Sequence, residues 1–244
     1  MAKWKTSIAK SDKDKTLIRG YELEQLIEKA TFTQMIFLIW KGEMPTKKEE
    51  AMLNTILVAS AEHGISPPSI TSARNAYSGS GQFNSAVAAG VLAIGEHHGG
   101  AIESCAKLLS ENKSAKEIVD NAIANKQRLP GFGHKIYTTD PRTTIIFKKA
   151  EELGFKGDFI KTVIDIEKYL EKNKGRKFCI NVDGAISAVM LEMGFDYKLG
   201  MGFFLMARTA GIIGHVHEEA LHEKPFRRLD NEETSYEGPK ERKL

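Results

Sequence analysis

The sequence predicts an all-α protein, and three observations support that fold class. Apolar residues recur at three- and four-residue spacing through most segments, which is the period of an amphipathic helix. Cap residues precede many of these segments and glycines follow several of them. Strand-like alternation is nearly absent, since only Lys177–Ile180 reads as a short extended run.

Start and stop signals bound the expected helices. Thr31 is expected to cap a helix that Gly42 closes, and Thr46 forms a capping-box pattern with Glu49. Ser114 stands in the same position before another apolar-periodic segment. Further helices are expected over residues 21–30, 85–95, 101–110, 142–153, 158–172, 185–193 and 197–222.

Composition narrows the class of protein. The 244 residues are 41% hydrophobic, which is enough for one large domain or two closely packed ones. The 35 basic and 32 acidic residues nearly balance, so neither nucleic acid nor an anionic membrane is an expected partner. We see no apolar span of about 20 residues and no signal core behind Met1. Since Cys105 and Cys179 form no CxxC motif, we expect a cytoplasmic protein with two buried free thiols.

The loop 129–142 combines glycines, a histidine and an arginine. Glycines let the backbone approach a ligand closely, and His134 can move a proton near neutral pH. Arg142 offers a planar fork that matches a carboxylate. One segment therefore holds the groups needed to bind an acidic small molecule and to perform acid–base chemistry on it.

Four other residues each allow two interpretations when taken alone. His98 is either a neutral hydrogen-bond donor at a helix N-terminus or a satisfied polar residue at a helix junction. Asp183 is either an N-cap or a carboxylate base, and His63 is either a surface residue or a ligand contact. Arg208 lies in an apolar helix and needs an anion, which is either a structural acid or a ligand carboxylate.

A metal site is not expected. His215 and His217 are two residues apart on a predicted helix and so face different sides, and no HExxH or paired-cysteine motif occurs. Gly79-Ser80-Gly81 lacks the GK[ST] of a phosphate loop.

Taken together and in order, the motifs resemble the citrate synthase superfamily. The resemblance is closest to the short single-subunit citryl-CoA lyases and extends to the C-terminal lyase domain of ATP-citrate lyase. The segments that carry it are Arg19-Gly20-Tyr21, Gly42–Thr46, Glu62-His63, His98–Ala101, Pro130–His134, Asp140-Pro141-Arg142, Asn181–Asp183 and Ala207–Gly211.

The resemblance implies a citrate synthase-like helical fold that is trimmed at its N-terminus. It implies a large helical domain over residues 1–112 and 198–244, and a small helical domain on the coenzyme A side over residues 113–197.

The resemblance also implies roles for individual residues. Asp183 would move the methyl proton of acetyl-CoA, His98 would hydrogen-bond the thioester oxygen, and His134 would hold the oxygen on C3. The substrate carboxylates would be bound by His63, Arg142 and Arg208. Coenzyme A, as part of the substrate, would lie against Pro130, Gly131, Phe132, Gly133 and Lys135. No metal and no tightly bound prosthetic group are implied.

Three departures from the synthase pattern matter. The chain is much shorter than ordinary citrate synthases, so peripheral N-terminal elements are expected to be missing. The loop between His134 and Asp140 is one residue shorter, and the late Arg-Pro that reaches the neighbouring active site is replaced by Lys224-Pro225. Arg227 and Arg228 lie just beyond and are candidates for that contact, which would require a homodimer or a higher homo-oligomer.

These departures favour a citryl-CoA lyase, which cleaves citryl-CoA supplied by a separate synthetase to acetyl-CoA and oxaloacetate. The alternative is a compact citrate or 2-methylcitrate synthase. A third possibility is a non-catalytic partner that binds coenzyme A esters.

Overall fold

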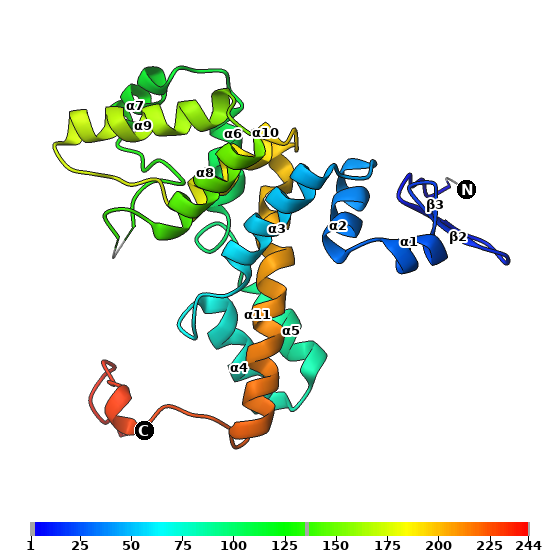
Figure 1. Cartoon of the computed structure of the whole chain (residues 1–244). Helices are drawn as coiled ribbons and strands as arrows, with labels where there is room; N and C mark the ends of the chain where they lie inside the picture. The colour runs from blue at the N-terminus through cyan, green and yellow to red at the C-terminus, as the bar shows by residue number, and fades with distance from the viewer. Residues whose placement is uncertain (1–2, 135–136, 244) are drawn as a thin grey trace. The chain divides into compact units, whose positions relative to one another are not determined.

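The computed structural model describes residues 3–134 and 137–243, and this part of the chain is helical apart from a small N-terminal sheet (Figure 1). The predicted all-α class is therefore confirmed. The α-helices are α1 (Leu23–Lys29), α2 (Phe32–Lys41), α3 (Lys47–Ala61), α4 (Pro68–Ser80), α5 (Phe83–Leu92), α6 (Ala101–Leu109), α7 (Ala115–Ala124), α8 (Pro141–Leu153), α9 (Asp158–Lys174), α10 (Val182–Glu192) and α11 (Gly200–His222). Two short 3-10 helices are η1 (Tyr197–Leu199) and η2 (Asn231–Glu233).

The predicted helix boundaries follow from local capping. Thr31, Thr46 and Ser114 each accept a hydrogen bond from the third residue of their helix and complete a capping box. Gly42 ends α2 with a φ of 90°, a conformation that glycine adopts without steric cost.

The N-terminal sheet was not predicted. Strands β1 (Ala9–Ser11), β2 (Thr16–Ile18) and β3 (Tyr21–Glu22) form an antiparallel sheet in that order. They are too short for a recognisable alternating pattern. Arg19 links this sheet to α2 by donating two hydrogen bonds, 2.7 and 3.2 Å long, to the Ile39 carbonyl. The extended run expected near residue 180 forms only an isolated bridge between Phe132 and Ile180.

The chain divides into two compact units. One comprises Met1–His63 and Gly95–Arg208, and the other comprises Gly64–Ile94 and Thr209–Leu244. These bounds differ from the predicted domain boundaries near residues 112 and 197, which stay a prediction.

The core of the first unit is built around α10, which packs against α6, α8 and α9. Ile186 and Met190 of α10 are fully buried together with Ile102 and Ile166. Burying one such side chain stabilises the fold by about 1.5–3 kcal/mol. Because α10 packs against three other helices, the position of its N-terminus within this unit is fixed by the core.

The second unit is built from α4, α5 and the C-terminal part of α11. Its core contains Ile70, Ala73, Ala86, Ile212 and Val216. No helix was predicted at α4, whose sequence is rich in serine, threonine and asparagine, residues that compete with helix formation.

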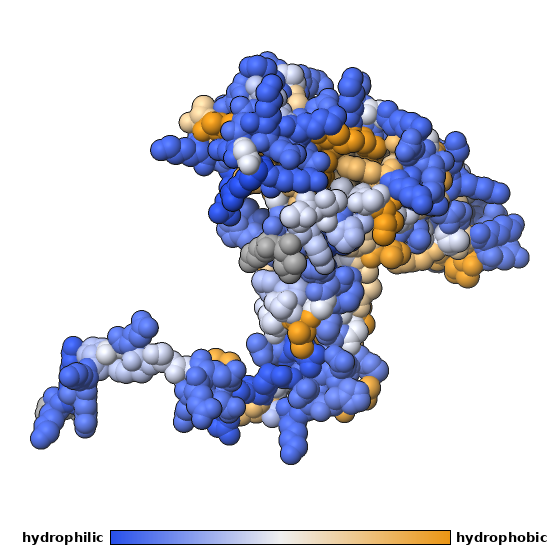
Figure 2. All heavy atoms as spheres, turned by 60° about the vertical axis from the view of Figure 1, so that its left-hand side comes forward, coloured by the Kyte–Doolittle hydropathy of each residue, from blue (hydrophilic) through white to orange (hydrophobic). Residues whose placement is uncertain are grey.

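Tyr197–His222 is, among the described residues, the helical segment long and apolar enough to cross a membrane. The expectation of no such span does not hold for it, although core helices of globular proteins meet the same criterion. Phe203, Arg208, Ile212 and Val216 of this segment are buried within the protein. The face seen in Figure 2 is mostly hydrophilic, with hydrophobic side chains in scattered patches.

Candidate active site

Most of the predicted site residues lie in the first unit. These are His63, His98, Phe132, Gly133, His134, Arg142, Asp183 and Arg208 together with Pro130 and Gly131. Arg227 and Arg228 belong to the second unit, and Lys135 lies outside the described residues.

Asp183 is the second residue of α10, but it does not cap the helix. Asn181 is the N-cap, because its side-chain oxygen accepts hydrogen bonds from the backbone N–H groups of Asp183 (3.0 Å) and Gly184 (3.2 Å). The capping role that the sequence left open for Asp183 therefore belongs to Asn181. The capping hydrogen bonds of α10 therefore do not involve the Asp183 carboxyl.

The pKa of Asp183 is raised to about 6, chiefly because burial disfavours the charged carboxylate. Arg142 and Arg208 act in the opposite direction, and the charge of Asp140 adds to the increase. A carboxyl with this pKa is present in both protonation states near neutral pH. It is suited to give and to take a proton.

His98 lies in the tight loop that precedes α6. Its backbone N–H and carbonyl pair with Gly95 at 3.0 and 2.9 Å, and its ring packs edge-on against Phe204 at 5.3 Å between centroids. Gly99 has a φ of 90°, and a Cβ there would collide with the Phe204 ring. Burial and, secondarily, the charge of Arg208 lower the pKa of His98, which favours the neutral imidazole. The sequence predicted this neutral form from the helix dipole, whereas burial is the larger cause.

His134 is oriented by Tyr137. Its Nδ1 accepts a hydrogen bond from the Tyr137 backbone N–H at 3.1 Å, and the two rings stack at 4.6 Å. Since Nδ1 is the acceptor, the neutral ring carries its proton on Nε2 and can donate it to a ligand oxygen.

The loop that carries His134 is pinned to the segment that leads into α10. The Gly133 N–H donates to the Cys179 carbonyl at 2.7 Å, and the Asn181 N–H donates to the Gly131 carbonyl at 3.0 Å. A Cβ on Gly131 would meet Cys105 Sγ at 2.8 Å and the Gly184 backbone. Gly131 therefore permits close packing of the loop against α10, and it is itself buried.

Arg208 is a buried cation with an unsatisfied donor. Only 3% of it is exposed, its Nε donates to the Ser60 carbonyl at 3.0 Å, and it lies 5.0 Å from the centre of the Phe204 ring. Its buried Nη1 has no hydrogen-bond partner among the described residues. Although the charge of Glu62 acts on Arg208, an unpaired buried donor costs about 1–3 kcal/mol. A ligand carboxylate would satisfy it.

Arg142 lies near enough to His63 for its charge to act on the pKa of that histidine. Arg142 is held by Asp140 through two hydrogen bonds, 3.0 Å from Nε and 2.8 Å from Nη2. The pKa of His63 is lowered by burial and then by the charges of Arg142, Arg208 and His134. The structure therefore places His63, Arg142 and Arg208, which were predicted to bind substrate carboxylates, near one another.

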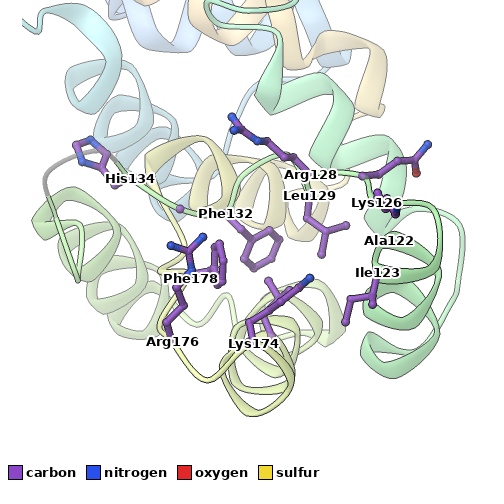
Figure 3. Close-up of a pocket in the computed structure, with 13 residues that line it drawn as sticks. Ala122, Ile123, Lys126, Arg128, Leu129, Phe132, His134, Lys174, Arg176 and Phe178 are labelled. Carbon is purple, nitrogen blue, oxygen red and sulfur yellow. The ribbon is translucent and has the colours of Figure 1, made fainter.

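A cavity of about 590 Å³ adjoins the loop. Figure 3 shows Phe132 at its centre between Leu129 and Phe178. Gly133 and His134 also line it, whereas Pro130 and Gly131 do not. Its wall carries four cations that the sequence analysis missed, namely Lys126, Arg128, Lys174 and Arg176. The first two directly precede the glycine loop, which was the available signal.

In the second unit, Arg227 and Arg228 have different surroundings. Arg227 Nη2 donates to Glu219 Oε2 at 2.8 Å and lies 3.4 Å from Glu223. Arg228 lies over the Phe226 ring, 5.6 Å from its centre, in an exposed stretch. Arg227 is thus committed to an internal ion pair.

Both cysteines are free and buried, as expected. Burial raises the pKa of Cys105 to about 12 and also raises that of Cys179. No group of three or more His, Cys, Asp or Glu residues that could hold a metal occurs within residues 3–134 and 137–243.

Comparisons with known proteins agree with this arrangement. The chain matches the family "Citrate synthase, C-terminal domain" over residues 1–53 and 47–229. The citrate/2-methylcitrate synthase of Bacillus subtilis is 30% identical over 89% of the chain and 58% of the relative. The chain spans about half the length of the curated relatives it matches.

Solved structures extend the likeness. The structure of citryl-CoA lyase from Hydrogenobacter thermophilus superposes with a TM-score of 0.94 and 43% identity, covering 99% of this chain and 97% of that one. Citrate synthase from Thermoplasma acidophilum, in a ternary complex with carboxymethyl coenzyme A and oxaloacetate, gives a TM-score of 0.73 and 28% identity, covering 88% and 59%. Because the family model matches residues 1–53 and 47–229, the chain belongs to the citrate synthase family.

Proposed function

We propose that this protein is a citryl-CoA lyase, which cleaves citryl-CoA to acetyl-CoA and oxaloacetate. The observation that carries the proposal is a carboxyl with a pKa near 6, Asp183, in the same electrostatic cluster as the carboxylate-binding cations Arg142 and Arg208. The likeness in length and fold to the Hydrogenobacter lyase favours cleavage over synthesis.

Substrate binding follows from the cations of the site. The oxaloacetate half of citryl-CoA carries carboxylates, which Arg142 and Arg208 can bind through their guanidinium N–H groups. The buried Nη1 of Arg208 gains an acceptor in this complex. His63 supplies a neutral donor beside them.

The carbon–carbon step then needs three groups. The C3 hydroxyl loses its proton, its oxygen lone pair forms the ketone of oxaloacetate, and the bond from C3 to the methylene carbon breaks. The electron pair of that bond becomes the enolate of acetyl-CoA, whose oxygen the neutral His98 stabilises. Protonated Asp183 gives its proton to the methylene carbon to form the methyl group. His134 donates from Nε2 to the C3 oxygen while the hydroxyl proton passes to solvent water. Asp183 takes up a proton from solvent before the next turnover, so one proton is released for each proton consumed.

The coenzyme A side is proposed to use the cavity beside Phe132. Its apolar centre suits the adenine ring, and its cationic wall suits phosphate groups. This placement keeps Phe132 and Gly133 as coenzyme A contacts and adds Lys126, Arg128 and Lys174.

A compact citrate or 2-methylcitrate synthase is the alternative, which the names of the curated relatives favour. Both enzymes share the carbon–carbon step, but a synthase also hydrolyses citryl-CoA. We propose in addition that the protein is cytoplasmic, works with a separate citryl-CoA synthetase, and forms a homo-oligomer in which Arg228 reaches a neighbouring site.

The decisive experiment supplies citryl-CoA to the purified protein and quantifies four products in one tube. Oxaloacetate and acetyl-CoA in excess support the lyase. Citrate and free coenzyme A in excess support the synthase. If neither pair forms while coenzyme A esters still bind, the protein is a binding partner and both enzymatic proposals fail.

A further inference from the structure

Asp140 is hydrogen-bonded both to Arg142 and to the residue that precedes Asp183. It is fully buried and is the N-cap of α8. Its Oδ1 accepts from Arg142 Nε (3.0 Å) and its Oδ2 accepts from Arg142 Nη2 (2.8 Å). The same Oδ2 accepts the backbone N–H of Val182 at 3.1 Å. Val182 is the first residue of α10 and directly precedes Asp183.

Asp140 binds the edge of the Arg142 guanidinium that carries Nε and Nη2. Of the five N–H donors, Nε–H and one on Nη2 are directed at Asp140, which leaves the Nη1 and Nη2 edge for an incoming carboxylate. A planar fork that is held by one carboxylate loses less rotational freedom when it binds a second one.

Asp140 stays ionised although it is buried. Burial acts to raise its pKa, but the hydrogen bonds and charge of Arg142, together with the Val182 N–H, outweigh that effect and lower it. Its negative charge also contributes to the raised pKa of Asp183. One carboxylate is therefore linked to the orientation of Arg142, to the start of α10 and to the protonation of Asp183.

We propose that Asp140 is a positioning residue, which holds Arg142 in its carboxylate-binding orientation and fixes that arginine relative to the N-terminus of α10. The inference rests on the proposed function, because it assumes that Arg142 binds a substrate carboxylate. It goes beyond that function by naming the residue that aligns the binding and proton-transfer parts of the site.

Glu167 offers a matched control, because its side chain supports the same segment, residues 180–182, as Asp140 does. Glu167 Oε1 accepts the backbone N–H of Ile180 at 2.8 Å, two residues before α10, as Asp140 accepts that of Val182. No hydrogen bond links Glu167 to Arg142 within the described residues. Glu167→Gln therefore tests support of this segment without disturbing the arginine.

The test is a double-mutant cycle on oxaloacetate affinity, measured by calorimetry without turnover. Asp140→Asn should weaken oxaloacetate binding roughly tenfold, because a bidentate charged pair is lost. The same change in an Arg142→Gln background should have an effect of no more than about twofold, because the residue through which it acts is gone. Glu167→Gln should leave the affinity within about twofold of the parent.

A further readout and a second variant separate this role from a structural one. In Asp140→Asn, the pH at which the cleavage rate begins to fall should move lower, because a charge that raises the pKa of Asp183 has been removed. If Asp140→Asn does not fold, Asp140→Ser retains a capping oxygen and should show the same loss of affinity.

Equal losses in both backgrounds, or a lower melting temperature with unchanged affinity, would overturn the inference. A native protein that shows the expected coupling but does not cleave citryl-CoA would instead refute the proposed lyase activity. Failure of the native protein to bind oxaloacetate would refute both.

Discussion

The raised pKa of Asp183 leads to opposite pH dependences for cleavage and condensation. In the proposed mechanism, cleavage needs the protonated carboxyl, which predominates below the pKa of about 6, whereas condensation needs the carboxylate, which predominates above it. Half of the carboxyl is protonated at its pKa, and about 1% is protonated two units higher. The kcat/KM for cleavage should therefore fall roughly 50-fold between about pH 6 and about pH 8.

The assay follows citryl-CoA cleavage and the reverse condensation across about pH 5 to 8 at constant ionic strength. His98 and His63 do not obscure the result, because burial lowers the pKa of each and keeps the ring neutral over the upper part of this range. Asp183→Asn should reduce both rates roughly 10²- to 10⁴-fold, the usual contribution of a general acid or base. A cleavage rate that keeps rising about tenfold per unit down to pH 5 would show an ordinary carboxyl pKa and refute the reasoning.

Three further outcomes are expected. Arg208→Lys should raise the KM for citryl-CoA roughly tenfold, since an ammonium does not reproduce the planar guanidinium that presents Nη1, and steady-state kinetics that show an unchanged KM would contradict this role. Gly99→Ala should destabilise the fold by about 1–3 kcal/mol, because it combines a φ of 90° with a collision against Phe204; urea unfolding that matches the parent would show that the loop adapts. Lys174→Gln should raise the KM several-fold with little change in kcat, and this effect should shrink in high salt. Lys172→Gln on the same helix is the control, and an equal effect there would point to general charge alone.

Helix positions were predictable because their signals are local. A threonine or serine cap and a closing glycine lie within one turn of the helix they bound, so Thr46 and Gly42 could be interpreted from sequence. The short N-terminal strands lack such signals. Their pairing depends on contacts such as that between Arg19 and Ile39, twenty residues apart.

The residue types of the site were predictable, but several of their roles were not. Whether Asp183 caps α10 depends on Asn181, which the sequence analysis did not consider as a cap. The alignment by Asp140 requires a contact with Val182 across more than forty residues of chain. Likewise, the cationic wall joins Lys126 to Lys174, which the fold brings to one cavity from the turn after α7 and from the end of α9.

The two buried cysteines have a practical consequence for following motion during turnover. Thiolates are the reactive form of cysteine, and both native thiols are buried with raised pKa values. A single cysteine introduced at an exposed position, such as Ser235 in the C-terminal stretch, would therefore be the readily alkylated thiol. A fluorescent or spin label attached there would report on conformational change without prior removal of the native cysteines.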